Sequence, residues 1–338
     1  KTRWIEWRES LGDNSSSLKS LVGNASYLVK LKDGEPTTEL KIQGKPLPPN
    51  YNWTSSGLNF VGFPVNDDND WNLESYFIKA GSFLSTSTFY NYTAGDLGSN
   101  NPAKVYGERT TSLLRGRAYW LDTGSIPEYY YGPFKVTLQN FKGLHFGNNS
   151  QTSSLRIRNV TNSDLNLKLS TVLGEVGPEG TPLENDLQKS LMIRRERDPE
   201  TQLYNFEACP CDDVEIKLAP KGEPGQEVEI VVGINRTLLD GDVGQNFSSI
   251  FRIEDTYGQS RVDLPTTAIK QSYDGLWIGE ALVDAVSRGN STTPEAVAKK
   301  FPLRFIFHQQ SIKLTTSASV TAGNGVNVPV KPLATKLD

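Results

Sequence analysis

The chain has 338 residues, more than one ordinary β-domain needs, so we expect two or three domains. Its 35 basic and 39 acidic residues give a net charge of −4 without a basic stripe, which argues against nucleic acid as a partner because neutralising phosphates requires clustered Lys and Arg. No apolar stretch approaches the ~20 residues of a membrane span. Aromatic residues make up 10% of the chain and are spread along it, so each segment has side chains to bury, which argues against a disordered protein.

The first segment with a clear pattern alternates polar and apolar residues with period two. Ser26–Lys32 and Thr38–Ile42 both alternate, and Asp33-Gly34 lies between them. Asp-Gly between two alternating segments is a strong short-range turn signal, so these residues predict a β-hairpin.

Two further segments predict the strands of a first core. Leu58–Val65 is apolar and ends near a proline, and Arg117–Asp122 is similarly apolar. We expect Phe60, Phe63 and Trp120 to occupy the inward positions of these strands.

An acidic run precedes the best helix candidate of this region. Residues 72–80 predict a short helix capped by Asp70 or Asn72. Asp68, Asp70 and Asn72 also have the alternate spacing at which hard oxygens converge on calcium, but the run lacks the Gly and Glu that complete a calcium loop. We interpret it as an Asx-rich turn and expect no cofactor, while structural calcium, with Asp68 and Asp70 as candidates, stays open.

Three consecutive tyrosines, Tyr129, Tyr130 and Tyr131, form the aromatic run that we expect to be exposed. They precede an apolar strand at Pro133–Leu138. Exposed aromatic rings stack on sugar rings, so these residues are the ligand-stacking candidates of a carbohydrate-binding module.

Short alternating strands recur after residue 140. They are Ser154–Val160, Leu165–Ser170, Val214–Leu218 and Glu227–Gly233, with turn residues between them. Strands at this spacing favour a β-sandwich. The predicted fold class is therefore all-β, with tandem immunoglobulin-like β-sandwich domains and one or two short helices.

The patterns divide the chain into three parts. Residues 1–139 predict a β-domain with the short helix, residues 140–270 an immunoglobulin-like β-sandwich, and residues 271–338 a partial β-unit with an extended tail. Within the last part, residues 294–300 predict a short helix before another strand.

The tail is rich in β-forming residues. Residues from Tyr273 onward are too few for a sandwich of about 100 residues, and unpaired strands tend to pair with another chain. We expect the segment Ile312–Val330 to complete a sheet in a neighbouring subunit. The assembly candidates are Ile312, Leu314, Val320, Val326 and Val328. The alternative, that the tail folds with residues outside this chain, stays open.

The two predicted strands of the first part carry a motif. Leu58–Val65 and Arg115–Trp120, which contains Gly-Arg-Ala-Tyr-Trp, resemble paired strands of a small domain that recurs in very large secreted modular proteins of bacteria. Leu58 stands where that motif has Trp. The resemblance implies location and architecture, and it carries no activity.

Later segments resemble the same class of proteins. Residues 141–235, with the strand Leu155–Asn159, resemble the immunoglobulin-like domains of bacterial surface proteins. Gly275–Gly279 followed by Pro302–His308 resembles another recurrent module of the giant proteins. Both resemblances imply a structural domain rather than a catalytic one.

Acceptor sequences for N-glycosylation occur nine times, against roughly four by chance. They begin at Asn14, Asn24, Asn52, Asn91, Asn148, Asn159, Asn235, Asn246 and Asn290. The excess predicts sugars on several of these residues, while the alternative, that Asn, Ser and Thr simply share loops, stays open. Because the chain begins with Lys1 rather than Met, we also expect a processed chain whose targeting segment has been removed.

The chain offers little for catalysis. Cys209 and Cys211 are spaced too tightly for a relaxed disulfide and are interpreted as free or strained cysteines in a loop. His145 and His308, in strand-like aromatic runs, are interpreted as packing residues. No nucleophile elbow, phosphate loop or zinc-protease motif is present, so we name no catalytic residue and expect no enzyme.

These features predict an extracellular structural or adhesive surface protein, a filament or surface-layer subunit joined by β-strand addition. The expected partners are further copies of the chain, with glycans as a second class. The alternative is a carbohydrate-binding module of a secreted multidomain protein. A structural subunit self-associates over a large interface, whereas a binding module is a monomer with exposed aromatic residues in a groove.

Overall fold

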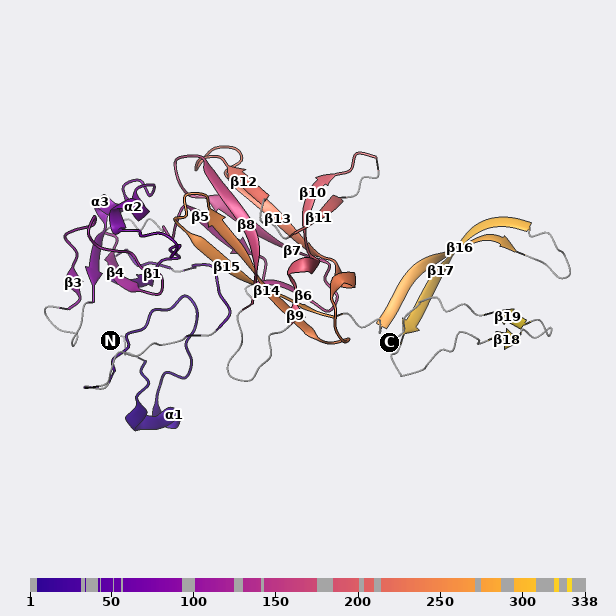
Figure 1. Ribbon diagram of the computed structural model, residues 1–338, viewed down its shortest axis with the longest axis horizontal. Helices are drawn as coiled ribbons and strands as arrows, with labels where there is room; N and C mark the ends of the chain where they lie inside the picture. Colours follow the sequence, from indigo (N-terminus) through magenta and orange to yellow (C-terminus); the bar gives the residue numbers. More distant parts are fainter. Residues whose placement is uncertain are drawn as a thin grey trace. The chain divides into compact units, whose positions relative to one another are not determined.

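The computed structural model divides the chain into two compact units, residues 1–270 and 271–338 (Figure 1). It describes residues 5–31, 34, 42, 44–50, 52–55, 57–92, 101–124, 130–140, 143–174, 185–200, 204–209, 214–270, 275–286, 295–307, 319–321 and 327–329. Within these ranges no helix is long and apolar enough to cross a membrane.

Strands dominate the described part of both units, and its helices are short. The α-helices are α1 (Gly12–Ser15), α2 (Leu73–Phe77) and α3 (Phe83–Thr86), and 3₁₀ turns lie at Glu9–Leu11, Gln188–Ser190 and Arg236–Leu238. The strands of the first unit are β1 (Asn59–Gly62), β2 (Thr88–Asn91), β3 (Ala103–Lys104), β4 (Ala118–Asp122), β5 (Phe134–Leu138), β6 (Leu144–Gly147), β7 (Thr152–Asn159), β8 (Leu165–Leu173), β9 (Asn185–Asp186), β10 (Leu191–Arg197), β11 (Tyr204–Ala208), β12 (Val214–Leu218), β13 (Glu227–Ile234), β14 (Asn246–Asp255) and β15 (Arg261–Ile269). The second unit contributes β16 (Gly275–Val286), β17 (Glu295–Phe307), β18 (Ser319–Thr321) and β19 (Asn327–Pro329).

The first sheet has the strand order β1-β4-β2-β3 and packs against α2 and α3. The α2 helix begins at the predicted cap, Asn72, whose side chain accepts a hydrogen bond from the Ser75 backbone while the Ser75 side chain accepts one from the Asn72 backbone. The Phe77 ring is buried at the centre of an aromatic core, 4.8 Å from the Phe83 ring and 5.3 Å from the Phe89 ring.

The prediction that Phe60, Phe63 and Trp120 all face inward is confirmed for Phe63 and wrong for the other two. Tyr119 and Leu121 take the inward positions of β4, so Trp120 points to the opposite face because side chains alternate along a strand. There its ring stacks on Phe60 with centroids 4.5 Å apart, and both side chains are half-buried.

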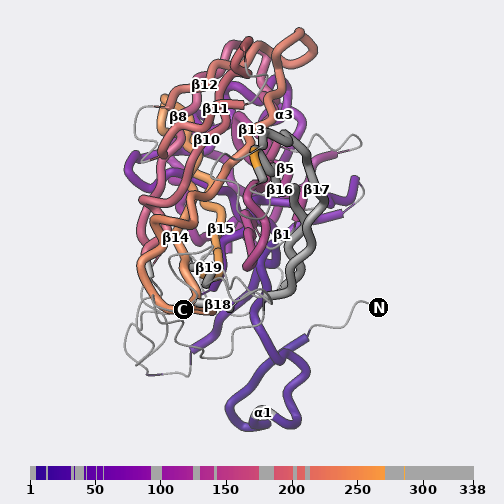
Figure 2. Tube along the Cα trace, turned by 90° about the vertical axis from the view of Figure 1, so that its right-hand side faces the viewer, coloured from indigo at the N-terminus to yellow at the C-terminus, as the bar shows by residue number. Residues whose placement is uncertain are grey.

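The sandwich consists of a five-stranded sheet, β11-β10-β13-β7-β5, and a six-stranded sheet, β12-β8-β14-β15-β6. The 90° turned view of Figure 2 shows strands of the two sheets running alongside each other. Residues from both inner faces form one buried cluster, in which Ile157, Leu167, Val232 and Phe251 are fully enclosed. The all-β fold class with a β-sandwich is confirmed. The β5 strand, which lies before residue 140, belongs to this sandwich because it pairs with β7.

The segment predicted as the N-terminal hairpin forms no strand in its described half, residues Ser26–Leu31. Most of the other half lies outside the described residues. Alternation favours a strand only where a neighbour supplies backbone partners, and the described part of the chain places no strand beside this segment.

The second unit contains a long hairpin of β16 and β17. The predicted helix over 294–300 is wrong, because residues from Glu295 onward belong to β17. The Ala- and Lys-rich composition of residues 294–300 favours a helix, but pairing with β16 along the hairpin overrides that weak preference.

The described part of the tail pairs with itself. Strands β18 and β19 form a two-stranded sheet in which Val320 lies opposite Val328. Both residues therefore lie in paired strands, and whether the tail also completes a sheet in a neighbouring subunit stays a prediction. The other candidates, Ile312, Leu314 and Val326, lie outside the described residues.

Candidate functional site

A polar site with many connections lies in the first unit, where the turn between β14 and β15 meets the segment that precedes α2. Val65 and Ser260 form a backbone bridge, the Asn66 amide donates to the Gln259 carbonyl at 3.1 Å, and the Arg261 amide donates to the Pro64 carbonyl at 3.0 Å. These backbone bonds join segments nearly 200 positions apart. We call the contact region formed by residues 64–79 and 254–261 the joint.

Side chains reinforce the joint around the tip of the turn. The Trp71 Nε1 donates to the Gly258 carbonyl at 2.8 Å, and the Lys79 ammonium lies 3.3 Å from the centre of the Tyr257 ring. Gly258 has a φ of +68°, and an added Cβ would lie 2.4 Å from the Asn69 Nδ2. This position therefore favours glycine for its backbone conformation as well as for space.

Tyr76 links three segments at the buried centre of the joint. Its hydroxyl lies 3.0 Å from the Ser260 Oγ and donates to the Tyr131 carbonyl, also at 3.0 Å. The side chain is fully buried, and burial raises the pKa of its hydroxyl well above the ordinary value. A phenol held in its neutral form serves as a hydrogen-bond donor here.

Asp255 is the buried carboxyl group of the joint. It is 2% exposed and accepts backbone hydrogen bonds from Ser260 at 2.5 Å and Tyr257 at 3.1 Å. Burial nevertheless raises its pKa, because the desolvation of the charged form outweighs these hydrogen bonds and the nearby Lys79 ammonium. Burial in the same place lowers the pKa of Lys79.

The raised pKa of Asp255 predicts a pH dependence with a defined sign. Above its ordinary pKa of about 3.9 the native state binds more protons at this group than the unfolded state, so its contribution to stability falls as pH rises through the native pKa. Asp255→Asn keeps an acceptor oxygen and removes the titration. The stability of this variant relative to wild type is expected to rise with pH in that window, by up to about 1.4 kcal/mol per pH unit. Urea unfolding of both proteins at closely spaced pH values measures the difference, and a flat difference would contradict the assignment.

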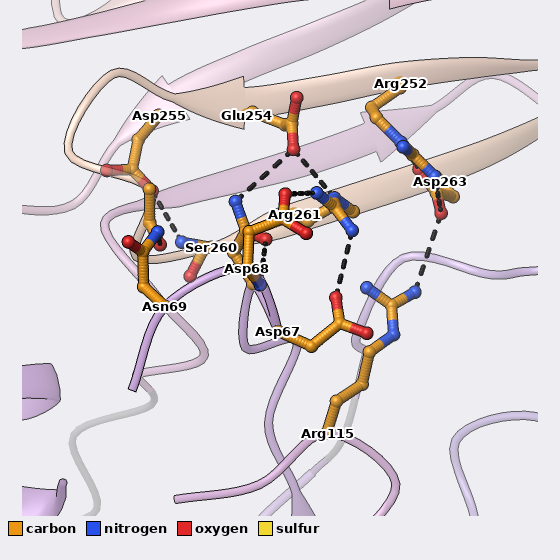
Figure 3. Close-up of polar contacts among 12 residues, drawn as sticks. Asp67, Asp68, Asn69, Arg115, Arg252, Glu254, Asp255, Ser260, Arg261 and Asp263 are labelled. Atoms are coloured by element: carbon orange, nitrogen blue, oxygen red, sulfur yellow. Dashed lines mark hydrogen bonds and ion pairs between the residues drawn. The ribbon is translucent and has the colours of Figure 1, made fainter. Parts of the chain in front are cut away.

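An ion cluster closes the exposed side of the joint (Figure 3). The Arg261 side chain, 11% exposed, places its Nε 2.7 Å from the Glu254 Oε1 and one terminal nitrogen 2.9 Å from the Asp67 Oδ1, and it also contacts Asp68. A neighbouring aspartate, Asp263, pairs with Arg252 at 2.8 Å and with Arg115 at 3.5 Å. Ion pairs between guanidinium and carboxylate groups thus connect the two sides of the contact.

The two calcium candidates have separate environments. Both are exposed, and Asp68 contacts Arg261. The predicted Asx turn is present, since the Asn66 side chain accepts a hydrogen bond from the Asp68 backbone. Among the described residues, no group of three or more His, Cys, Asp or Glu side chains is placed to hold a metal ion.

The tyrosine run is not an exposed platform. Tyr130 is 4% exposed and packs in the aromatic core, and Tyr131 is half-buried with its ring 5.0 Å from the Trp53 ring. The run contacts the buried centre of the joint, because the Tyr131 backbone carbonyl accepts a hydrogen bond from the Tyr76 hydroxyl. Tyr129 lies outside the described residues. The prediction of an exposed run is therefore wrong for Tyr130 and only partly met by Tyr131.

A hollow of about 180 Å³ lies beside the joint. Apolar side chains, among them Tyr131, Phe134 and Val262, line it together with polar Asn52 and Lys135. It is smaller than the ~300 Å³ at which pockets for drug-sized ligands begin, so one small ring is the largest group that it suits.

The glycosylation candidates differ in access. Asn14, Asn52, Asn148 and Asn246 are exposed, Asn24, Asn91 and Asn235 are half-buried, and Asn290 lies outside the described residues. Asn159 is fully buried, and its side chain donates to the Ser163 and Ala219 carbonyls at 2.8 Å. It stabilises the turn after β7, so the folded protein does not present it as a glycosylation site.

The cysteine and histidine interpretations both change. Cys209 is disulfide-bonded and buried in the sandwich core, and no described cysteine is free, so the free alternative of the expected free or strained cysteines is wrong. Its partner in the sequence, Cys211, lies outside the described residues, as does His308. His145 lies on the exposed side of β6 with its Nδ1 2.7 Å from the Thr267 Oγ1, so it is not a buried packing residue.

No sequence pattern singles out Arg261, Tyr76 or Asp255. The contacts of Tyr76 with Ser260 and of Arg261 with Asp67 and Asp68 join positions 184 to 194 apart, so local periodicity carries no trace of them. The one local clue is the turn signal at Tyr257-Gly258 between two alternating strands. This turn signal predicts the hairpin of β14 and β15, but not the segment before α2 that the hairpin contacts.

No protein-family model and no curated protein matches the sequence. Weak likenesses to solved structures include PapD-like domain 7 of human CEP192 (TM-score 0.24, 10% identity, 43% of this chain and 92% of that one) and the Pseudomonas aeruginosa CupB2 chaperone (TM-score 0.25, 11% identity, 57% and 96%). Another is the Salmonella enterica SafA pilin in complex with the SafB chaperone (TM-score 0.24, 10% identity, 49% and 67%). Likenesses this weak support no inference about what this chain binds.

Proposed function

We propose that the protein is an extracellular structural or adhesive surface protein whose subunits assemble through β-strand addition. The observation that carries the proposal is the joint. Backbone hydrogen bonds, the Tyr76 hydroxyl and the Arg261 ion cluster fasten the segments around α2 to the sandwich. A subunit that transmits or resists force needs such a rigid connection between domains.

The charged groups of the joint support a structural role. Arg261 is matched by carboxylates, and Asp255 is held by backbone amides. Adjacent Glu254 and Asp255 point to opposite sides of β14, so they do not flank a common substrate position. That the protein is not an enzyme remains a prediction on these grounds.

Assembly can be measured directly on the purified chain. We expect light scattering after size-exclusion chromatography to show a mass that grows with protein concentration, and negative-stain electron microscopy to show linear assemblies. A concentration-independent monomer in both measurements would contradict the proposal.

The second candidate function is carbohydrate binding, and the hollow beside the joint favours it. Tyr131 offers an aromatic surface there, and Asn52 and Lys135 offer hydrogen-bonding groups of the kind that sugar hydroxyls accept. A monomer that binds a simple hexose in titration calorimetry, and loses that binding on Tyr131→Ala, would decide for this function over the structural one.

A further inference from the structure

The N-terminal segment exposes an unusual share of apolar surface. Of the eighteen large hydrophobic side chains that are exposed in the described part of the first unit, nine lie within residues 5–47. They are Ile5, Trp7, Leu11, Leu21, Val22, Val29, Leu31, Ile42 and Leu47. Soluble proteins rarely leave contiguous apolar surface uncovered, so this concentration indicates an interaction segment. Figure 2 shows its first part, in indigo, as an open loop around α1.

Within this segment, Tyr27–Leu31 has the pattern of an added strand. Val29 and Leu31 stand two positions apart, so in an extended strand they share one face, and they are 63% and 47% exposed. Neither residue makes a backbone hydrogen bond to another described residue. The stretch is therefore a strand former whose apolar face lacks cover in the described part of its own chain.

A matching acceptor lies on the sandwich. Strand β12 ends the six-stranded sheet and pairs on one side only, with β8. Its inward residues Val214 and Ile216, also two positions apart, stay half-buried, although their register partners Leu169 and Leu167 on β8 are fully buried. The core is thus left partly open at this edge, and the charged residues of β12 lie on the outer face of the sheet.

We infer that residues 27–31 of one copy add as a strand to β12 of a second copy. This inference rests on the proposed function and names its connector, which is the N-terminal segment rather than the C-terminal tail. Strand addition pairs the open backbone groups of β12 and lays Val29 and Leu31 beside Val214 and Ile216, because the two apolar pairs share the period of a strand.

Interface size and symmetry agree with this assignment. The nine exposed side chains of the whole N-terminal segment, of which Val29 and Leu31 are two, expose on the order of 800 Å², so the segment as a whole has the area that one partner contributes to an interface of standard size. The two contact surfaces differ, so the contact is head-to-tail, and its repetition gives an open chain of subunits rather than a closed dimer.

Val29→Pro tests the donor. Proline removes the backbone donor at position 29, where the described residues offer no hydrogen bond to lose, so the fold is expected to survive while the dissociation constant for assembly rises at least roughly tenfold. Val29→Thr, which keeps the backbone donor and the β-branched shape, is the matched control and should assemble far better than Val29→Pro. Thermal unfolding of each variant monitors the fold.

Ile216→Arg tests the acceptor, and a mixture makes the test independent of folding effects. Each variant alone should be monomeric, but Val29→Pro still accepts a strand and Ile216→Arg still donates one. Their equimolar mixture should therefore form a heterodimer and nothing longer. If wild type assembles while the mixture stays monomeric, or while Val29→Pro assembles like wild type, the N-terminal connector is wrong and the structural function stands. If wild type itself is a monomer, the N-terminal connector and the proposed structural function are both wrong.

Discussion

Arg261→Ala is expected to lower the free energy of unfolding by about 2 to 3 kcal/mol. The Arg261 side chain is 11% exposed and meets Glu254, Asp67 and Asp68. Its removal leaves three carboxylates facing one another without a cation. The effect should fall below the ~3–5 kcal/mol of fully buried pairs, because Asp67 and Asp68 are 58% and 66% exposed and water screens them.

Two control variants separate the cluster from charge alone. Arg261→Lys keeps the charge but not the planar fork of donors, so it should recover part of the loss. Arg8→Ala removes an ion pair with Glu6 whose side chains are 63% and 46% exposed, and should cost less than about 1 kcal/mol. Urea unfolding measures all three. Equal losses for Arg261→Ala and Arg8→Ala would show that the cluster does not hold the joint.

The sandwich strands could be predicted because their alternating pattern allows only one choice of the face that packs on the core. In β8, apolar and polar residues alternate, and buried and exposed positions follow the same alternation from Leu165 to Leu169. Period two with one apolar face fixes which side meets the core. The same local information predicts the cap of α2, where Asn72 and Ser75 bond each other.

Prediction fails where neighbouring residues compete for one face. Tyr119, Trp120 and Leu121 are all apolar, so their order in the sequence fits either orientation of β4. The surrounding core decides, since it buries Tyr119 and Leu121 fully. Such a choice depends on partners from distant segments and is absent from local periodicity.

The joint and the N-terminal segment are beyond local patterns for the same reason. Tyr76 meets Ser260 across 184 positions, and no spacing rule connects them. The alternation of Tyr27–Leu31 indicates a strand former, but whether a partner lies in the same chain is a question of tertiary structure. The described part of the chain places no partner strand beside residues 27–31, and for this reason the segment is a candidate connector between subunits.

Phe77→Ala is expected to lower the free energy of unfolding by about 3 to 5 kcal/mol, because Phe77 is 1% exposed and packs among Phe63, Phe83, Phe89 and Tyr130. The loss combines the transfer of a large ring from the core with a cavity that the surrounding rings fill incompletely.

Trp120→Ala is the matched truncation on the other face of the same sheet. The larger Trp120 side chain is half-buried and stacks on Phe60, so its removal opens no enclosed cavity and should cost about 1 to 2 kcal/mol. Thermal or urea unfolding of the two variants therefore determines which face of the first sheet is its core. If Trp120→Ala costs as much as Phe77→Ala, the outer face carries a packed layer of its own, and the stacked pair of Phe60 and Trp120 belongs to it.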